Sequence, residues 1–143
     1  MQELHGHYLD ELEVGMTAIM AKTVTEADIV LFAGVSGDFN PMHINEQFAL
    51  PTAFKGRIAH GMLTASLISA ALGMKLPGPG CIYLKQELRF KAPVRTGDTV
   101  QARVTVREIN HEKHRVVLDT VASVDGNVVL EGEATLMVPV RKQ

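Results

Sequence analysis

Residues 36 to 43 read SGDFNPMH, which places an acid, Asp38, and an imidazole, His43, five positions apart. Both groups can be tuned to titrate near neutral pH, so together they could act as a general acid–base pair. A spacing of five does not align two side chains on a helix, where neighbours on one face are three or four residues apart. Pro41 also disfavours helical geometry at Asn40 and removes a backbone donor. The stretch therefore predicts an irregular loop, and such loops often carry functional residues.

Helical segments flank this stretch. Before it, TVTEADIVLFAGVSGD predicts a short helix that Thr25 can cap. After it, QFALP predicts another turn or two, and residues 60 to 74 predict a stronger helix. In that helix small residues recur every four positions, and leucines supply bulk between them. Because it is apolar almost all round, we expect it to be buried. The sequence LPGPG then ends it.

The C-terminal half changes to a period of two. DTVQARVTVREI alternates apolar and polar side chains, which predicts a strand with one wet face. HRVVLDTVASV and NVVLEGEATLMVPV predict two more strands, joined by Asp125-Gly126, a pair suited to a tight hairpin. CIYLKQELRF and MTAIMAKTV predict a fourth and a fifth. One buried helix with mostly antiparallel strands predicts an α+β fold whose sheet wraps around the helix.

Composition narrows the class of protein. The 143 residues predict a single domain over 1–143, with an ordinary soluble balance of 46% hydrophobic and 21% charged residues. A net charge of −2 without a basic cluster argues against a nucleic acid or a membrane as a partner. The single cysteine, Cys81, leaves no intrachain disulfide and fits a reducing cytoplasm. The start has no signal-peptide pattern, and the longest apolar run is too short for a membrane span, so we expect a cytoplasmic protein.

The stretch FAGVSGDFNPMHINEQFA, Phe32 to Ala49, resembles the hydratase motif of the MaoC-like (R)-specific enoyl-CoA hydratases. That motif runs from an aromatic residue through Gly-Asp-x-Asn-Pro-x-His to a small residue. Met42 departs from it, because the family usually has a branched aliphatic residue there. IAHGMLTASLISAALG and IYLKQELRFKAPVRTGDTV resemble the family's central helix and the strand and turn after it. The resemblance extends from about Val14 to Val138 and implies the hot-dog fold and usually a homodimer.

The resemblance also implies a reaction. A hydratase of this family adds water to a (2E)-enoyl thioester and forms the (R)-3-hydroxyacyl thioester. Coenzyme A, or the phosphopantetheine of an acyl carrier protein, is then the handle of the substrate, and we expect no metal or redox cofactor. Asp38 and His43 would divide the proton transfers, and the sequence leaves open which is the base. Asn40 and Pro41 would support the loop.

Two residues of the central helix are further site candidates. Gly61, at the helix N-terminus, offers a free N–H and a positive dipole end for the developing oxyanion. A glycine there would also let the thioester carbonyl, or a packed neighbour, come close. The resemblance places Ser69 near the reacting pair, and close packing is an equal alternative for it. His60 is expected to have a structural or supporting role.

Several rival interpretations remain open. Asp38 and His43 could lie in a surface turn without a catalytic role. They could also bind a metal together with His60, although no HxxxH, HExxH or cysteine pair supports a metal site. A thioesterase of the same fold usually has an acid on or near the central helix, and residues 61 to 74 contain none. A 3-hydroxyacyl-acyl-carrier-protein dehydratase would use the same pair in reverse, and a non-catalytic thioester-binding module is the third alternative.

Four basic residues could bind coenzyme A phosphates, although solvent-exposed charge is the default interpretation of each: Lys55, Arg57, Arg89 and Lys91.

Overall fold

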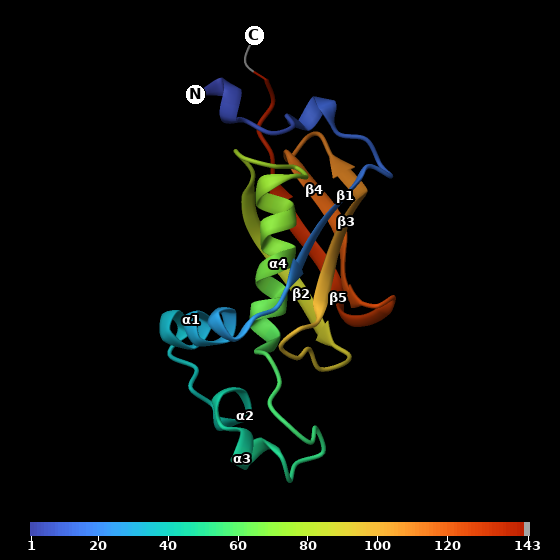
Figure 1. The fold of residues 1–143 in the computed structure, drawn as a ribbon. Coiled ribbons are helices and arrows are strands. Elements are labelled where there is room, and N and C mark those ends of the chain that lie inside the picture. Colours follow the sequence, from blue (N-terminus) through green and yellow to red (C-terminus); the bar gives the residue numbers. More distant parts are fainter. Residues whose placement is uncertain (142–143) are drawn as a thin grey trace.

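The structure, a computed structural model, describes residues 1–141 and contains one curved antiparallel sheet with a long helix against it (Figure 1). The strands run in the order β1-β3-β4-β5-β2, and every neighbouring pair is antiparallel. Their bounds are β1 Thr17–Thr23, β2 Ile82–Phe90, β3 Thr99–Asn110, β4 Arg115–Val124 and β5 Asn127–Met137. The five predicted strands and the α+β class are confirmed.

Period-two patterning sets the two faces of this sheet. In β3 the buried side chains are every second residue: Val100, Ala102, Val104 and Val106. The β4–β5 hairpin turns at Asp125 and Gly126, whose φ angles of 50° and 81° suit the tight turn predicted from this pair. The sheet therefore turns one apolar face inward, toward the helix.

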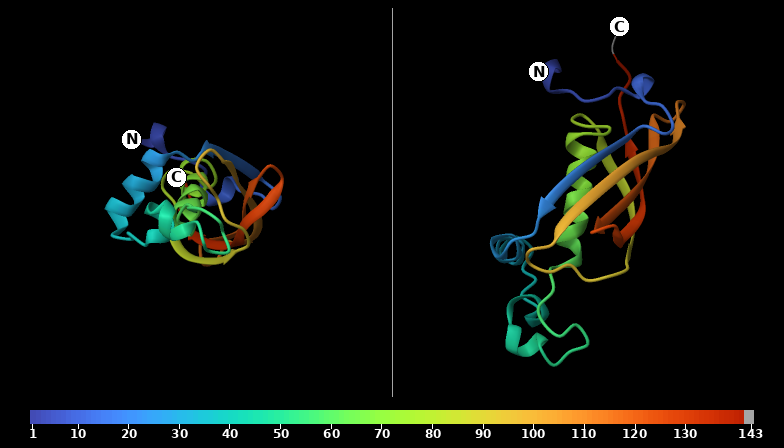
Figure 2. Two further views of the ribbon diagram at one scale, coloured as in Figure 1. Left: turned by 60° about the horizontal axis from the view of Figure 1, so that its bottom comes forward. Right: turned by 45° about the vertical axis from the view of Figure 1, so that its right-hand side comes forward.

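The central helix α4, Gly61–Met74, lies in the concave side of the sheet, and Figure 2 shows the strands curling around it. Leu67, Ile68 and Leu72 of this helix are buried in the hydrophobic core. The hot-dog arrangement is thereby confirmed. The expectation that the helix is buried all round was wrong in part, because Met62 is 55% exposed and Ser69 is also exposed.

Three short helices precede α4: α1 Glu26–Ser36 lies beside the end of the body where α4 begins, and α2 Pro41–Ile44 and α3 Glu46–Ala49 project beyond it (Figure 1). Two 3-10 turns, η1 Gln2–Leu4 and η2 Leu9–Glu11, lie near the N-terminus. The predicted loop is correct for Asp38 but wrong for His43, which lies in α2. Proline is favourable at the first position of a helix, and Pro41 begins α2 for this reason. Among the described residues, no helix is long and apolar enough to cross a membrane.

Candidate active site

Asp38 follows α1 directly and is held by hydrogen bonds to the local backbone. Thr25 caps the start of α1, and Gly37 ends the helix in the left-handed conformation, with φ 79°. The N–H of Asp38 donates to Ser36 Oγ at 3.1 Å, and Asp38 Oδ1 accepts from the N–H of Asn40 at 3.1 Å. One carboxylate oxygen is thus engaged by the turn. The other, Oδ2, is left for chemistry.

His43 is held in one orientation by α2 and by a backbone carbonyl. Asn40 caps α2, because its Oδ1 accepts from the N–H of Met42 at 3.0 Å. His43 Nδ1 lies 2.8 Å from the carbonyl oxygen of Ile58. A carbonyl can only accept, so Nδ1 carries the proton. The Nε2 atom of the neutral ring therefore presents a lone pair.

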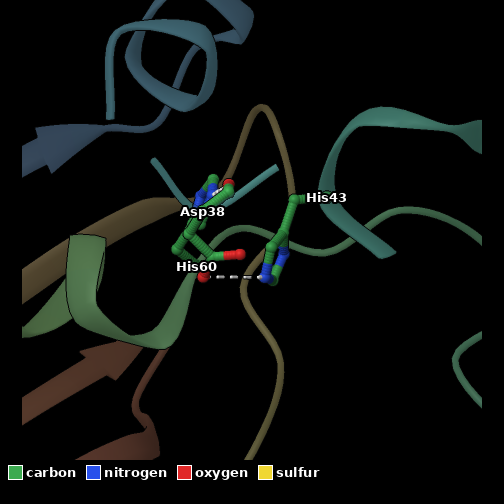
Figure 3. Close-up of side chains that lie close together, drawn as sticks. All are labelled: Asp38, His43 and His60. Atoms are coloured by element: carbon green, nitrogen blue, oxygen red, sulfur yellow. Dashed lines mark hydrogen bonds and ion pairs between the residues drawn. The ribbon is translucent and has the colours of Figure 1, made fainter. Parts of the chain in front are cut away.

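These two free atoms face each other. His43 Nε2 lies 4.0 Å from Asp38 Oδ2. Figure 3 shows the two side chains pointing toward each other. The distance is too long for a direct hydrogen bond, but both atoms can accept from one water molecule. The His43 side chain is only 11% exposed, whereas that of Asp38 is 49% exposed. The site thus combines a sheltered imidazole with a carboxylate open to solvent.

His60, the residue before α4, supports both members of the pair. Its Nε2 donates to the backbone carbonyl of Asp38 at 2.9 Å. Its ring stacks on that of His43, with centroids 3.9 Å apart, and packs against Phe32. His60 is 1% exposed. The structure therefore gives His60 the supporting position that we expected.

Arg57 connects the helices of the site, a role that the sequence did not reveal. Its Nε donates to the backbone carbonyl of His43 at 2.6 Å, and its Nη2 donates to Glu26 Oε1 of α1 at 2.9 Å. Arg95 in turn donates to the backbone carbonyl of Arg57 at 3.2 Å. Two guanidinium nitrogens of Arg57 are thus engaged within the chain. This arrangement favours a structural role over binding of a coenzyme A phosphate.

The N-terminus of α4 provides unpaired backbone donors beside Asp38. His60 occupies the N-cap position, but its side chain makes no capping hydrogen bond. Among residues 1–141, the N–H groups of Gly61 and Met62 have no hydrogen-bond partner. Such donors, together with the positive end of the helix dipole, suit a developing negative charge. A Cβ added at Gly61 would lie 2.6 Å from a ring carbon of Phe90, so a larger residue here would have to displace the Phe90 ring.

A cavity of about 500 Å³ opens over these groups. Asp38, His60 and Gly61 line it. Its other walls are mostly apolar and come from the segment before α4, from α4 itself, and from β2, β5 and the turn after β2: Phe54, Ile58, Ala59, Met62, Thr64, Phe90, Lys91, Ala92, Pro93, Val94, Val129 and Leu130. An apolar pocket with a few converging polar groups is the usual form of a small-molecule site.

Ser69 lies outside this cavity. It lines a second groove, between α4 and β2, together with Met62 and Tyr83. Within one chain the structure does not bring Ser69 to Asp38 and His43, and its role in the reaction stays a prediction. Of the basic residues considered for coenzyme A, Lys91 lines the mouth of the cavity and pairs with Glu131 at 3.4 Å.

The three side chains nearest the site also offer potential metal ligands. Asp38, His43 and His60 each have one ligand atom within 4.8 Å of those of the other two. The sequence showed no metal-binding pattern because these residues come from three separate segments. His60 Nε2 is already engaged by the carbonyl of Asp38, which leaves only its Nδ1 for a metal. The expectation of a site without metal stays a prediction.

Comparisons with known proteins agree on one family. Residues 11–127 match the MaoC-like domain family. An (R)-specific enoyl-CoA hydratase of Rhodospirillum rubrum is 58% identical over 135 residues, which cover 94% of each chain. A 3-hydroxybutyryl-CoA dehydratase of Methylorubrum extorquens is 48% identical over all of this chain and 91% of its own. The unliganded R-hydratase structure from Pseudomonas aeruginosa superposes with a TM-score of 0.89 and 46% identity, covering 96% of this chain and 89% of its own.

Proposed function

Because this chain belongs to the MaoC-like family, we propose that it is an (R)-specific enoyl-CoA hydratase. It adds water to a (2E)-enoyl thioester and gives the (R)-3-hydroxyacyl thioester, and it catalyses the reverse dehydration as well. The similarity to the hydratase of Rhodospirillum rubrum, at 58% identity, supports both the reaction and its stereochemistry. The protein is a hydro-lyase.

The facing pair of acceptors is the observation that carries this proposal. Asp38 Oδ2 and the lone pair on His43 Nε2 lie 4.0 Å apart. A water molecule has two hydrogens, and hydrogen bonds of about 2.8 Å would let it donate to both atoms at once. The bonds to Ser36, Asn40 and Ile58 hold these acceptors in place without a ligand. The site is therefore preorganised to hold one water with its oxygen lone pairs free to attack.

The chemical step then balances with these groups alone. The water oxygen bonds to C3 of the enoyl group and loses one proton to the pair, while C2 gains a proton from the pair. The carbonyl oxygen of the thioester carries the negative charge between these events. The free N–H groups of Gly61 and Met62, at the positive end of α4, stabilise that charge. This is why the proposal includes no metal or redox cofactor.

We further propose that the active protein is a homodimer. Strand β2 is an edge of the sheet, and its Ile82 and Leu84 are about half exposed. Beside it runs the groove that contains Met62 and Ser69 of α4. A long apolar edge strand left open is a liability in a monomer. A second copy, paired through β2, would continue the sheet and cover this groove. The expected cytoplasmic location stays a prediction.

Hydration of crotonyl-CoA tests the function. The assay follows the loss of enoyl-thioester absorbance for the wild type, Asp38→Asn and His43→Gln, with circular dichroism as the folding control. We expect the wild type to form the (R)-3-hydroxybutyryl product on chiral analysis. Each variant should lose about 100-fold or more of kcat, because each removes one proton-transfer group. Release of free coenzyme A without hydration would instead identify a thioesterase and refute the proposal.

A further inference from the structure

His60 lies between the two halves of the proposed reaction centre. It directly precedes Gly61, whose N–H is one of the proposed oxyanion donors at the start of α4. Its Nε2 atom lies 2.9 Å from the backbone carbonyl oxygen of Asp38. A carbonyl can only accept, so Nε2 carries the ring proton and donates it. One side chain thus connects the segment that carries the acid–base pair to the helix that carries the oxyanion donors.

The hydrogen bond from His60 is the long-range tie of the turn at residues 37–40. The other hydrogen bonds of this turn join near neighbours in the sequence, such as Ser36 and Asn40 with Asp38. Within residues 1–141, no second group donates to the Asp38 carbonyl. Burial does not fix the turn either, because the Asp38 side chain is 49% exposed and Phe39 is 57% exposed. Without His60, the turn could therefore shift relative to α4.

Stability alone does not explain a histidine at this position. Among residues 1–141, His60 Nδ1 and Thr64 Oγ1 are the buried side-chain polar atoms without a hydrogen-bond partner, and an unpaired buried atom destabilises the fold. Serine, threonine, aspartate or asparagine would cap the helix here, whereas His60 makes no capping bond. A capping side chain would also compete for the N–H of Met62. The histidine thus leaves both proposed oxyanion donors free.

We propose that His60 is a positioning residue that holds the Asp38 turn in register with the oxyanion donors of α4. This inference rests on the proposed function. In an enoyl thioester, C2 and C3 have to meet the acid–base pair while the carbonyl oxygen meets the free N–H groups. Covalent bonds fix the distances between these substrate atoms, so the two halves of the site need a matching separation. The hydrogen bond to Asp38 sets that separation, and the stacking of His60 on His43 is secondary to it.

His60→Gln and His60→Met form a matched pair that tests the hydrogen bond. The two new side chains have the same length and both remove the stacked ring, but only glutamine has an N–H to donate to the Asp38 carbonyl. The measurement is kcat and KM for crotonyl-CoA, with thermal unfolding as the folding control. We expect His60→Met to lower kcat by about 10- to 100-fold, the effect of a small displacement of a catalytic group. His60→Gln should recover most of that loss, and KM should change little in either variant.

His60→Phe is a third variant, which keeps an aromatic ring against His43 but cannot donate. We expect its kcat to fall as in His60→Met. Equal values of kcat in His60→Gln and His60→Met would refute the inference. Full activity in His60→Phe would mean that stacking, and not the hydrogen bond, positions the site. Losses of kcat that follow the loss of thermal stability across the three variants would reduce His60 to a structural role. A wild type that does not hydrate crotonyl-CoA would instead refute the proposed function.

Discussion

Replacing Arg57 should separate the role of this residue at His43 from its surface ion pair. Arg57→Met removes two interactions, the hydrogen bond from Nε to the His43 carbonyl and the ion pair with Glu26. A hydrogen bond from a charged group contributes about 1.5–3 kcal/mol. The Glu26 side chain is 55% exposed, so screening limits the ion pair to about 0.2–1 kcal/mol. We therefore expect Arg57→Met to lose about 2–4 kcal/mol of unfolding free energy.

Glu26→Gln is the matched control, because it removes only the ion pair. We expect it to lose at most about 1 kcal/mol in urea unfolding and to keep its kcat. Arg57→Met should also lower kcat for crotonyl-CoA by about 10- to 100-fold, since a small displacement of a catalytic group has effects of that size. KM should change little, because Arg57 does not line the cavity. Equal losses of stability in the two variants, or an unchanged kcat in Arg57→Met, would refute the reasoning.

Three shorter predictions test other parts of the structure. Gly61→Ala should lower kcat/KM because its Cβ would meet the Phe90 ring at 2.6 Å, and adding Phe90→Ala should restore part of the loss. Hydrogen bonding to the Thr25 backbone, with help from Lys22, lowers the pKa of Asp28 below its ordinary value of 3.8. The wild type should thus be more stable than Asp28→Asn at neutral pH, and urea unfolding should show this advantage disappearing as the pH falls through that lowered pKa. Leu84→Glu should shift the protein from dimer to monomer in sedimentation equilibrium, and a dimer that persists would contradict pairing through β2.

Patterning in the sequence predicted the scaffold well, because each element carries its own periodic signal. The alternation in β3 and the Asp125-Gly126 turn are local features, and the structure confirms both. The prediction failed where one residue has two opposite local effects. Pro41 disfavours helix before itself but favours it after, and only the second effect applies to His43.

The sequence supplied candidate residues for the site, but it did not predict their geometry. The motif identified Asp38 and His43, yet their 4.0 Å separation depends on a carbonyl, that of Ile58, from another segment. The positions of Arg57 and Thr64 depend on tertiary packing in the same way. From sequence, a threonine in a buried helix is interpreted as a packing residue. Only the folded chain shows that the Thr64 hydroxyl has no hydrogen-bond partner. Ser69 lines a different groove, and its role stays a prediction.

The three short helices before α4 lie largely apart from the hydrophobic core. Of residues 26–50, only Ile29, Ala33, His43 and Ala49 are buried, whereas the sheet and α4 supply nearly all of the large core side chains. Most side chains that set the position of Asp38 and His43 therefore contribute little to the burial that stabilises the fold. Substitutions at exposed positions of these helices can thus change the surroundings of the site while the core burial stays the same. This separation suits a scaffold that hosts different chemistries in different lineages.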